Sequence, residues 1–149
     1  MIDSCLIQVA TSTTSSLLAA VVASGSPTSS STTGYNARNT TISNSRIEGG
    51  YYGIRLHGVN TTTIYDFGNR LLNNVVTDYY FYGIYMYCQD SMQVNGNEVI
   101  QSRPNINADA IYLNDVANFE CIGNEALEAS DYGLWISDAN FLSFSSGTG

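Results

Sequence analysis

Short stretches in which hydrophobic and polar residues alternate recur along the chain, and turns rich in Gly, Asn and Asp separate them. Alternation with a period of two is typical of β-strands, and no stretch sustains the roughly 3.6-residue spacing of an amphipathic helix. The pattern therefore predicts an all-β protein built from short strands.

Five of these stretches align with one another, which indicates an internal repeat. They are AAVVASG (19–25), YGIRLHG (52–58), YGIYMYC (82–88), DAIYLND (109–115) and YGLWISD (132–138). The second position is always small, at Ala20, Gly53, Gly83, Ala110 and Gly133, which are spaced by 33, 30, 27 and 23 residues. The third position is always aliphatic, at Val21, Ile54, Ile84, Ile111 and Leu134. Small residues allow the chain to enter each strand from a tight corner, and the aliphatic residues predict an inward face.

The register continues downstream of each stretch. Ten residues beyond the aliphatic position come Ile64, Val94, Cys121 and Phe144, and in the first repeat the equivalent Ile42 is delayed by a polar insertion at 26–41. A third element places an apolar residue two positions after Ser or Asn, at Ile47, Leu71, Val99 and Ala126. Each repeat is therefore expected to contain two or three short strands.

A repeat of 20 to 33 residues made of short strands predicts a parallel β-helix of about five coils, in which equivalent strands of successive coils pair. One coil cannot bury its own inward face, but stacking buries like residues on one another. A β-sandwich would not require the recurring ten-residue offset, and a leucine-rich repeat would need a regular leucine motif. We expect a single domain over 1–149 with a polar loop at 26–41. Because neither end shows a recognisable cap, we expect the chain to be a piece of a longer protein or to be closed by a partner.

The segments YYGIRLHG, FYGIYMYC and DAIYLND resemble the right-handed parallel β-helix repeats of the pectate-lyase-like superfamily. This resemblance covers nearly the whole chain and implies a right-handed, single-stranded parallel β-helix. It also implies a range of functions, from polysaccharide lyases and glycoside hydrolases to tailspikes, adhesins and inactive coils. Members commonly bind polysaccharide along one parallel sheet.

The composition narrows the choice of partners. Charged residues make up 12% of the chain and the net charge is −8. The chain contains five arginines and no lysine. Such a surface does not suit nucleic acid or anionic membranes, and no segment approaches the roughly 20 apolar residues of a membrane span. The abundance of Ser, Thr, Asn and Tyr is more usual for secreted or cell-surface proteins. The odd count of three cysteines, without a CxxC pair, argues against a disulfide framework or a zinc site.

Strand alternation sends the fourth and sixth positions of each repeat outward. The fourth column is Val22, Arg55, Tyr85, Tyr112 and Trp135, and the sixth is Ser24, His57, Tyr87, Asn114 and Ser137. We expect solvent-facing aromatic rings that bind sugar, with Tyr85, Tyr87, Tyr112, Asn114 and Trp135 as substrate-binding residues. The alternative is that these rings only stabilise neighbouring strands or are covered by another subunit, as in a stalk, adhesin or tailspike-like scaffold.

Candidates for catalysis lie beside this face. Asp115 and Asp138 occupy the same position on adjacent coils, so their carboxylates could act as the pair of a hydrolase, while Arg55 and His57 could serve lyase chemistry. Asp90 is a further candidate. The alternative for the aspartates is ordinary turn chemistry. If the protein is an enzyme, we expect a polysaccharide lyase or glycoside hydrolase. We expect no cofactor, with calcium as a weak alternative, and we expect end-to-end or lateral self-association as an option.

Overall fold

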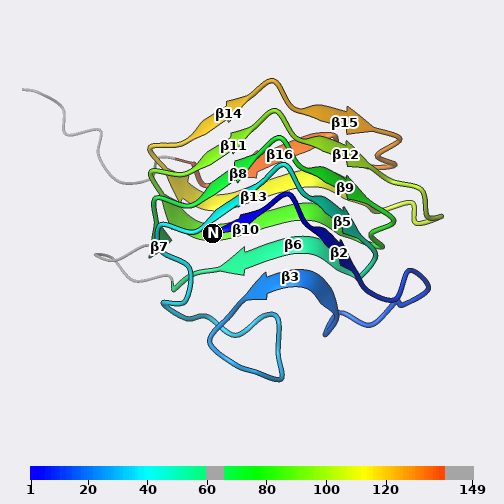
Figure 1. Ribbon diagram of the computed structural model, residues 1–149, viewed down its shortest axis with the longest axis horizontal. Coiled ribbons are helices and arrows are strands. Elements are labelled where there is room, and N and C mark those ends of the chain that lie inside the picture. Colours follow the sequence, from blue (N-terminus) through cyan, green and yellow to red (C-terminus); the bar gives the residue numbers. More distant parts are fainter. Residues whose placement is uncertain (60–65, 140–149) are drawn as a thin grey trace, which may run out of the picture.

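The computed structural model describes residues 1–59 and 66–139, and its regular structure consists of β-strands that form three sheets. Figure 1 shows the strands of successive turns lying one above the other. Within these residues no helix is long and apolar enough to cross a bilayer. The prediction of an all-β parallel solenoid is confirmed.

Each sheet collects equivalent strands from successive turns of the chain. The first sheet contains β1 (Ile2–Asp3), β4 (Thr41–Ser43), β8 (Arg70–Leu72), β11 (Gln93–Asn95) and β14 (Glu120–Ile122). The second contains β3 (Ala19–Ala23), β6 (Tyr52–His57), β10 (Tyr82–Asp90), β13 (Asp109–Ala117) and β16 (Leu134–Ser137), with β7 (Asp66–Phe67) paired to the end of β10. The third contains β2 (Leu6–Gln8), β5 (Arg46–Glu48), β9 (Val75–Thr77), β12 (Glu98–Ile100) and β15 (Glu125–Leu127).

All the strand pairings that join these turns are parallel, as in β10 with β13 and β12 with β9. Strands from five turns enter each sheet, but only three turns have a neighbour on both sides. The enclosed body is therefore about three turns, fewer than the five coils that the repeat predicted. The outermost turns have no neighbouring turn on one side within the described residues.

The core consists of columns of like residues. Ile54, Ile84 and Ile111 pair in register in the second sheet, with Val21 before them and Leu134 after them. The three isoleucines are buried, whereas Leu134, on the last strand of the stack, is 47% exposed. Burial at these positions is thus supplied by the next coil, and the predicted inward column is confirmed.

One coil departs from the predicted register. Leu71 lies in the first sheet, where it pairs with Ile42 and Val94, and Val76 takes its expected place between Ile47 and Val99 in the third sheet. The assignment of Leu71 to the third element was wrong. The sequence between β6 and β8 is longer than the equivalent sequence between β10 and β11, and this shifts the following strands along the chain. Ile64 and Phe144, which were assigned to the first sheet, lie outside the described residues.

A ladder of asparagine side chains lies at the corner between the first and third sheets. The Asn74 side-chain amide donates to Asn97 Oδ1 at 3.0 Å, and that of Asn97 donates to Asn124 Oδ1 at 3.0 Å. The same oxygens accept backbone N–H groups, because Asn97 Oδ1 also accepts from the Asn74 backbone at 3.0 Å. These bonds satisfy turn groups that no strand pairs, which buried polar groups require.

The small residue of the repeat is needed for packing between sheets. A Cβ added to Gly83 would lie 2.3 Å from Val99 Cγ1 and 2.7 Å from the Ala110 carbonyl oxygen. The second and third sheets approach each other closely there. The corner geometry that the sequence suggested is therefore not the main reason for a small residue at this position.

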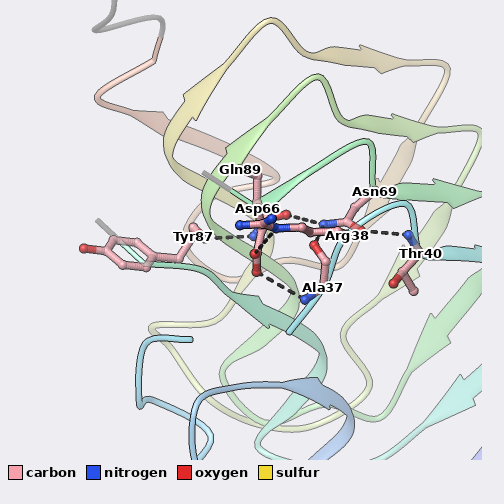
Figure 2. A network of polar contacts seen from close by, with 7 residues as sticks. All are labelled: Ala37, Arg38, Thr40, Asp66, Asn69, Tyr87 and Gln89. Atoms are coloured by element: carbon pink, nitrogen blue, oxygen red, sulfur yellow. Dashed lines mark hydrogen bonds and ion pairs between the residues drawn. The ribbon is translucent and has the colours of Figure 1, made fainter. Parts of the chain in front are cut away.

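The segment 24–40 connects β3 to β4, and a buried polar network holds its end against the solenoid (Figure 2). Asp66, which is buried, accepts the Ala37 backbone N–H at 3.3 Å and lies 3.7 Å from Arg38 Nε. Burial raises the pKa of the Asp66 carboxyl, while the Ala37 N–H and the Arg38 charge act in the opposite direction. The segment is thereby attached to β7 at its second end.

Asn69 connects this network to the second sheet. Its side-chain amide donates to Gln89 Oε1 at 2.6 Å and to the Ala37 carbonyl, and its Oδ1 accepts the Thr40 backbone N–H at 3.0 Å (Figure 2). Gln89 in turn donates to the Tyr87 carbonyl at 3.0 Å. A single polar cluster therefore joins the 24–40 segment to the strand that carries Tyr85 and Tyr87.

Replacing Asn97 by Ala is expected to lower the free energy of unfolding by about 2 kcal/mol, because buried donors and acceptors of two neighbouring coils lose their partners. Urea unfolding followed by circular dichroism measures this change. Asn107→Ala is the control, since Asn107 is exposed in a turn. Equal stabilities of the two variants would show that the ladder does not stabilise the fold.

Candidate functional site

The outward face of the second sheet carries a column of planar side chains, as the alternation predicted. Arg55 on β6, Tyr85 on β10, Tyr112 on β13 and Trp135 on β16 pair directly in register. Neighbouring strands lie about 4.8 Å apart, close to the stacking distance of flat groups. We refer to these four residues as the aromatic ladder.

The planes of the ladder residues face one another. The Tyr85 and Tyr112 ring centroids are 4.9 Å apart with an interplanar angle of 3°, and those of Tyr112 and Trp135 are 4.3 Å apart at 16°. The Arg55 guanidinium lies 4.9 Å from the Tyr85 ring centroid and 4.3 Å from that of Tyr52. The flat faces are therefore largely occupied by contacts within the ladder.

This stacking corrects the expected exposure of the rings. Tyr85 and Tyr112 are each only 8% exposed, so the prediction that these side chains face solvent was wrong. They point away from the core, but their neighbours cover them. Trp135 lies on the last strand of the sheet and is 39% exposed. The ladder thus offers a flat ring surface mainly at its Trp135 end.

The second outward column reinforces the ladder. The rings of His57 and Tyr87 stack at 4.5 Å with an angle of 22°. The Asn114 side-chain amide donates to the Tyr112 hydroxyl at 2.9 Å, and that hydroxyl also forms a hydrogen bond with Ser137 at 3.2 Å.

Burial raises the pKa of Tyr85 to about 12, so its hydroxyl stays protonated at neutral pH. The structure therefore brings all five predicted substrate-binding residues onto one face.

A band of further aromatic residues, which the sequence reasoning did not assign, flanks the ladder. The Tyr52 ring lies 5.8 Å from that of Tyr82, and Tyr51 lies 4.8 Å from Tyr52 and 5.2 Å from Phe81. At the other end, Tyr132 lies 5.4 Å from Trp135. The sequence pattern that could have identified this band is the tyrosine at the first position of three repeats, directly before the small residue. Ladder and band together form one continuous aromatic surface.

Arg55 and His57 meet at the β6 end of the ladder. The Arg55 guanidinium lies 3.2 Å from His57 Nδ1 and 3.5 Å from the Ser30 hydroxyl, and its buried Nε has no hydrogen-bond partner. Burial, and then the Arg55 charge, lowers the pKa of His57 to about 4. The imidazole is therefore neutral at physiological pH and can accept a hydrogen bond from Arg55.

The candidate aspartates occupy equivalent left-handed backbone positions, with Asp115 inside β13 and Asp138 directly after β16. Asp115 and Asp138 have φ angles of 53° and 51°, and Cys88 at the equivalent place has 52°. Asp tolerates this left-handed conformation better than most residues, which accounts for its presence there. The Asp115 carboxylate lies 3.8 Å from the Cys88 thiol. Asp90 ends β10 and accepts from the Asn118 side chain at 2.9 Å. A catalytic role for these aspartates stays a prediction.

Potential metal ligands are dispersed. Within residues 1–59 and 66–139 no three His, Cys, Asp or Glu side chains converge, and the remaining residues are of none of these types. Burial raises the pKa of the Cys88 thiol to about 12, so it stays protonated. Met86 and Met92 are buried in the hydrophobic core.

The single histidine allows a direct test of this electrostatic arrangement. An NMR titration of His57 is expected to give a pKa of about 4 instead of the ordinary 6.5. The pKa of His57 is lower in the folded protein than in the unfolded chain, so neutral His57 favours folding. This contribution to the free energy of unfolding is complete above pH 6.5 and is lost as the pH falls towards 4. Arg55→Met should raise the pKa, though burial keeps it below 6.5. A midpoint near 6.5 in the parent protein would contradict the arrangement.

Comparison with known proteins yielded no match among curated proteins or solved structures. One family model matches residues 5–146, and its description is "Periplasmic copper-binding protein (NosD)". The match spans nearly the whole chain and includes all the strands that carry the aromatic surface. The chain therefore belongs to the NosD family of right-handed parallel β-helix proteins.

Proposed function

We propose that this protein is a β-helix module located outside the cytoplasm that binds polysaccharide on the outward face of its second sheet. The observation that carries the proposal is the continuous aromatic surface formed by the ladder and its flanking tyrosines. Aromatic rings offer apolar surface to the C–H faces of sugars, and tyrosine hydroxyls supply hydrogen bonds. The periplasmic description of the family is consistent with this location.

The rings would make different contacts along the surface. Trp135 and Tyr132, which are exposed on the last coil, are available for stacking against a sugar ring. Tyr85 and Tyr112 are covered by their neighbours and would support the surface instead of contacting sugar through their faces. Tyr87 and Asn114, which are partly exposed, would provide polar contacts.

Binding without catalysis accounts for the site better than processing does. The presence of Asp at 115 and 138 is explained by the left-handed backbone conformation of these positions, and Arg55 and His57 are buried against each other. A scaffold without any ligand is the second candidate. It is favoured by the close stacking of Tyr85 on Tyr112, which by itself stabilises neighbouring coils by about 1 kcal/mol.

The family description also suggests copper, but the residues of this chain do not fit it. Copper sites in proteins are built from converging imidazole, thiolate and thioether groups. Nδ1 of His57, the only histidine, lies against the Arg55 cation, and the Cys88 thiol is buried and protonated. Cys5 is exposed, and within the described residues it belongs to no group of three His, Cys, Asp or Glu side chains. We therefore do not extend copper binding to this chain.

Trp135→Ala combined with Tyr132→Ala is expected to weaken polysaccharide binding at least about tenfold, because two sugar–ring contacts are lost. Affinity electrophoresis in gels that contain a polysaccharide panel measures the change. Tyr35→Ala is the control, since Tyr35 is similarly exposed but lies outside the aromatic surface. If the parent protein migrates equally with and without every polysaccharide, the scaffold function is favoured instead.

Dialysis against Cu²⁺ followed by elemental analysis is expected to leave the Cys5→Ser protein without stoichiometric copper. The substitution removes the exposed thiol, which could take up copper without a site. The NMR signals of His57 should stay sharp when Cu²⁺ is added, because bound paramagnetic copper would broaden them. Retention of one copper per chain, with broadening of His57, would contradict this expectation.

A further inference from the structure

An open pocket of about 700 Å³ lies beside the aromatic surface, at the corner that connects the third sheet to the second. It is formed by the turn after β12 and by the equivalent corner of the next coil. Its lining includes Tyr80, Arg103, Pro104, Ile106, Glu128 and Ser130. Pockets of this size accommodate one or two sugar rings.

The walls of the pocket are held by hydrogen bonds to a buried side chain. The Gln101 amide donates to the carbonyls of Arg103 and Asn105, both at 2.9 Å, and its Oε1 accepts the Ser130 backbone N–H at 2.9 Å. The Asn105 side chain donates to the Tyr80 carbonyl at 2.7 Å. The pocket therefore joins residues of three coils in a defined arrangement.

The pocket continues the aromatic surface. Tyr80 lines it, and the Tyr80 ring lies 5.5 Å from that of Tyr51, which contacts Tyr52 at 4.8 Å. A polysaccharide chain that binds along the band beside Tyr52 and Tyr82 would thus reach the pocket at one end.

The charges that line the pocket do not favour an acidic ligand. The Arg103 guanidinium stacks on the Tyr80 ring at 4.9 Å and donates to the carbonyls of Gly50 and Thr13 at 3.3 and 2.6 Å. Two of its five N–H donors are thereby engaged by the protein. Glu128 is exposed and contributes a negative charge, within a protein whose net charge is −8. Ile106 and Pro104 add exposed apolar surface.

From these contacts we infer that the pocket binds an uncharged sugar ring of the polysaccharide. The inference rests on the proposed function and specifies its ligand class. Tyr80, Pro104 and Ile106 pack against the apolar face of the sugar, and the Glu128 carboxylate accepts hydrogen bonds from sugar hydroxyls. Carboxylated sugars, such as uronates, would be repelled by Glu128.

Affinity electrophoresis with hydroxyethyl cellulose, galactomannan and polygalacturonate tests the inference. We expect retardation by at least one of the two neutral polymers and none by polygalacturonate. Ile106→Ser combined with Glu128→Gln should weaken binding to the neutral polymer about fivefold or more. Ile122→Ser is the control, because Ile122 is similarly exposed on β14 of the first sheet.

The outcomes separate this inference from the proposed function. If Trp135→Ala with Tyr132→Ala weakens binding but the pocket variant binds like the parent, the pocket inference is overturned and the proposed function stands. Retardation by polygalacturonate overturns the neutral ligand class alone. Failure of all three polymers overturns both. Since Ile106 is 83% exposed, its replacement should leave the circular dichroism spectrum unchanged, and the Ile106 methyl signal should shift when the neutral polymer is added.

Discussion

The stacking of equivalent residues on successive coils is the physical constraint from which the other properties of this protein follow. Parallel pairing in register places each side chain about 4.8 Å from its equivalents in the coils before and after it. Inside the solenoid this builds the column of Ile54, Ile84 and Ile111, and at the corner it builds the asparagine ladder. A residue on an edge strand of the described part of the chain has less cover, as the exposure of Leu134 on β16 shows.

The same constraint determines the chemistry of the outward face. Side chains at that spacing stack when they are flat, so Tyr85 and Tyr112 turn their faces to each other, and the planar guanidinium of Arg55 joins the stack as the ring of a tyrosine would. Stacking stabilises the sheet but leaves less open ring surface than a row of separate aromatics. The surfaces that can meet a ligand are therefore the end of the ladder, its flanks and the neighbouring pocket.

Membership of the NosD family establishes the architecture, whereas function depends on the side chains that each member carries on it. Within residues 1–59 and 66–139 no three His, Cys, Asp or Glu side chains converge, and the aromatic surface is the most developed chemical feature. The left-handed backbone conformation shared by Cys88, Asp115 and Asp138 also follows from the solenoid, because these residues occupy equivalent positions on successive coils. Aligned carboxylates on such a fold are consequently weak support for catalysis.

The sequence by itself determined the strand period, the repeat and the division into inward and outward residues, because these depend only on local alternation and on spacing along the chain. It therefore predicted the columns of Ile84 and of Tyr85 correctly. Only the tertiary structure decided that Tyr85 is buried, that Val76 and not Leu71 completes the third sheet, and that residues near 80, 103 and 128 line an open pocket. These properties depend on which side chains of other coils lie within contact distance, and loops of variable length set that arrangement.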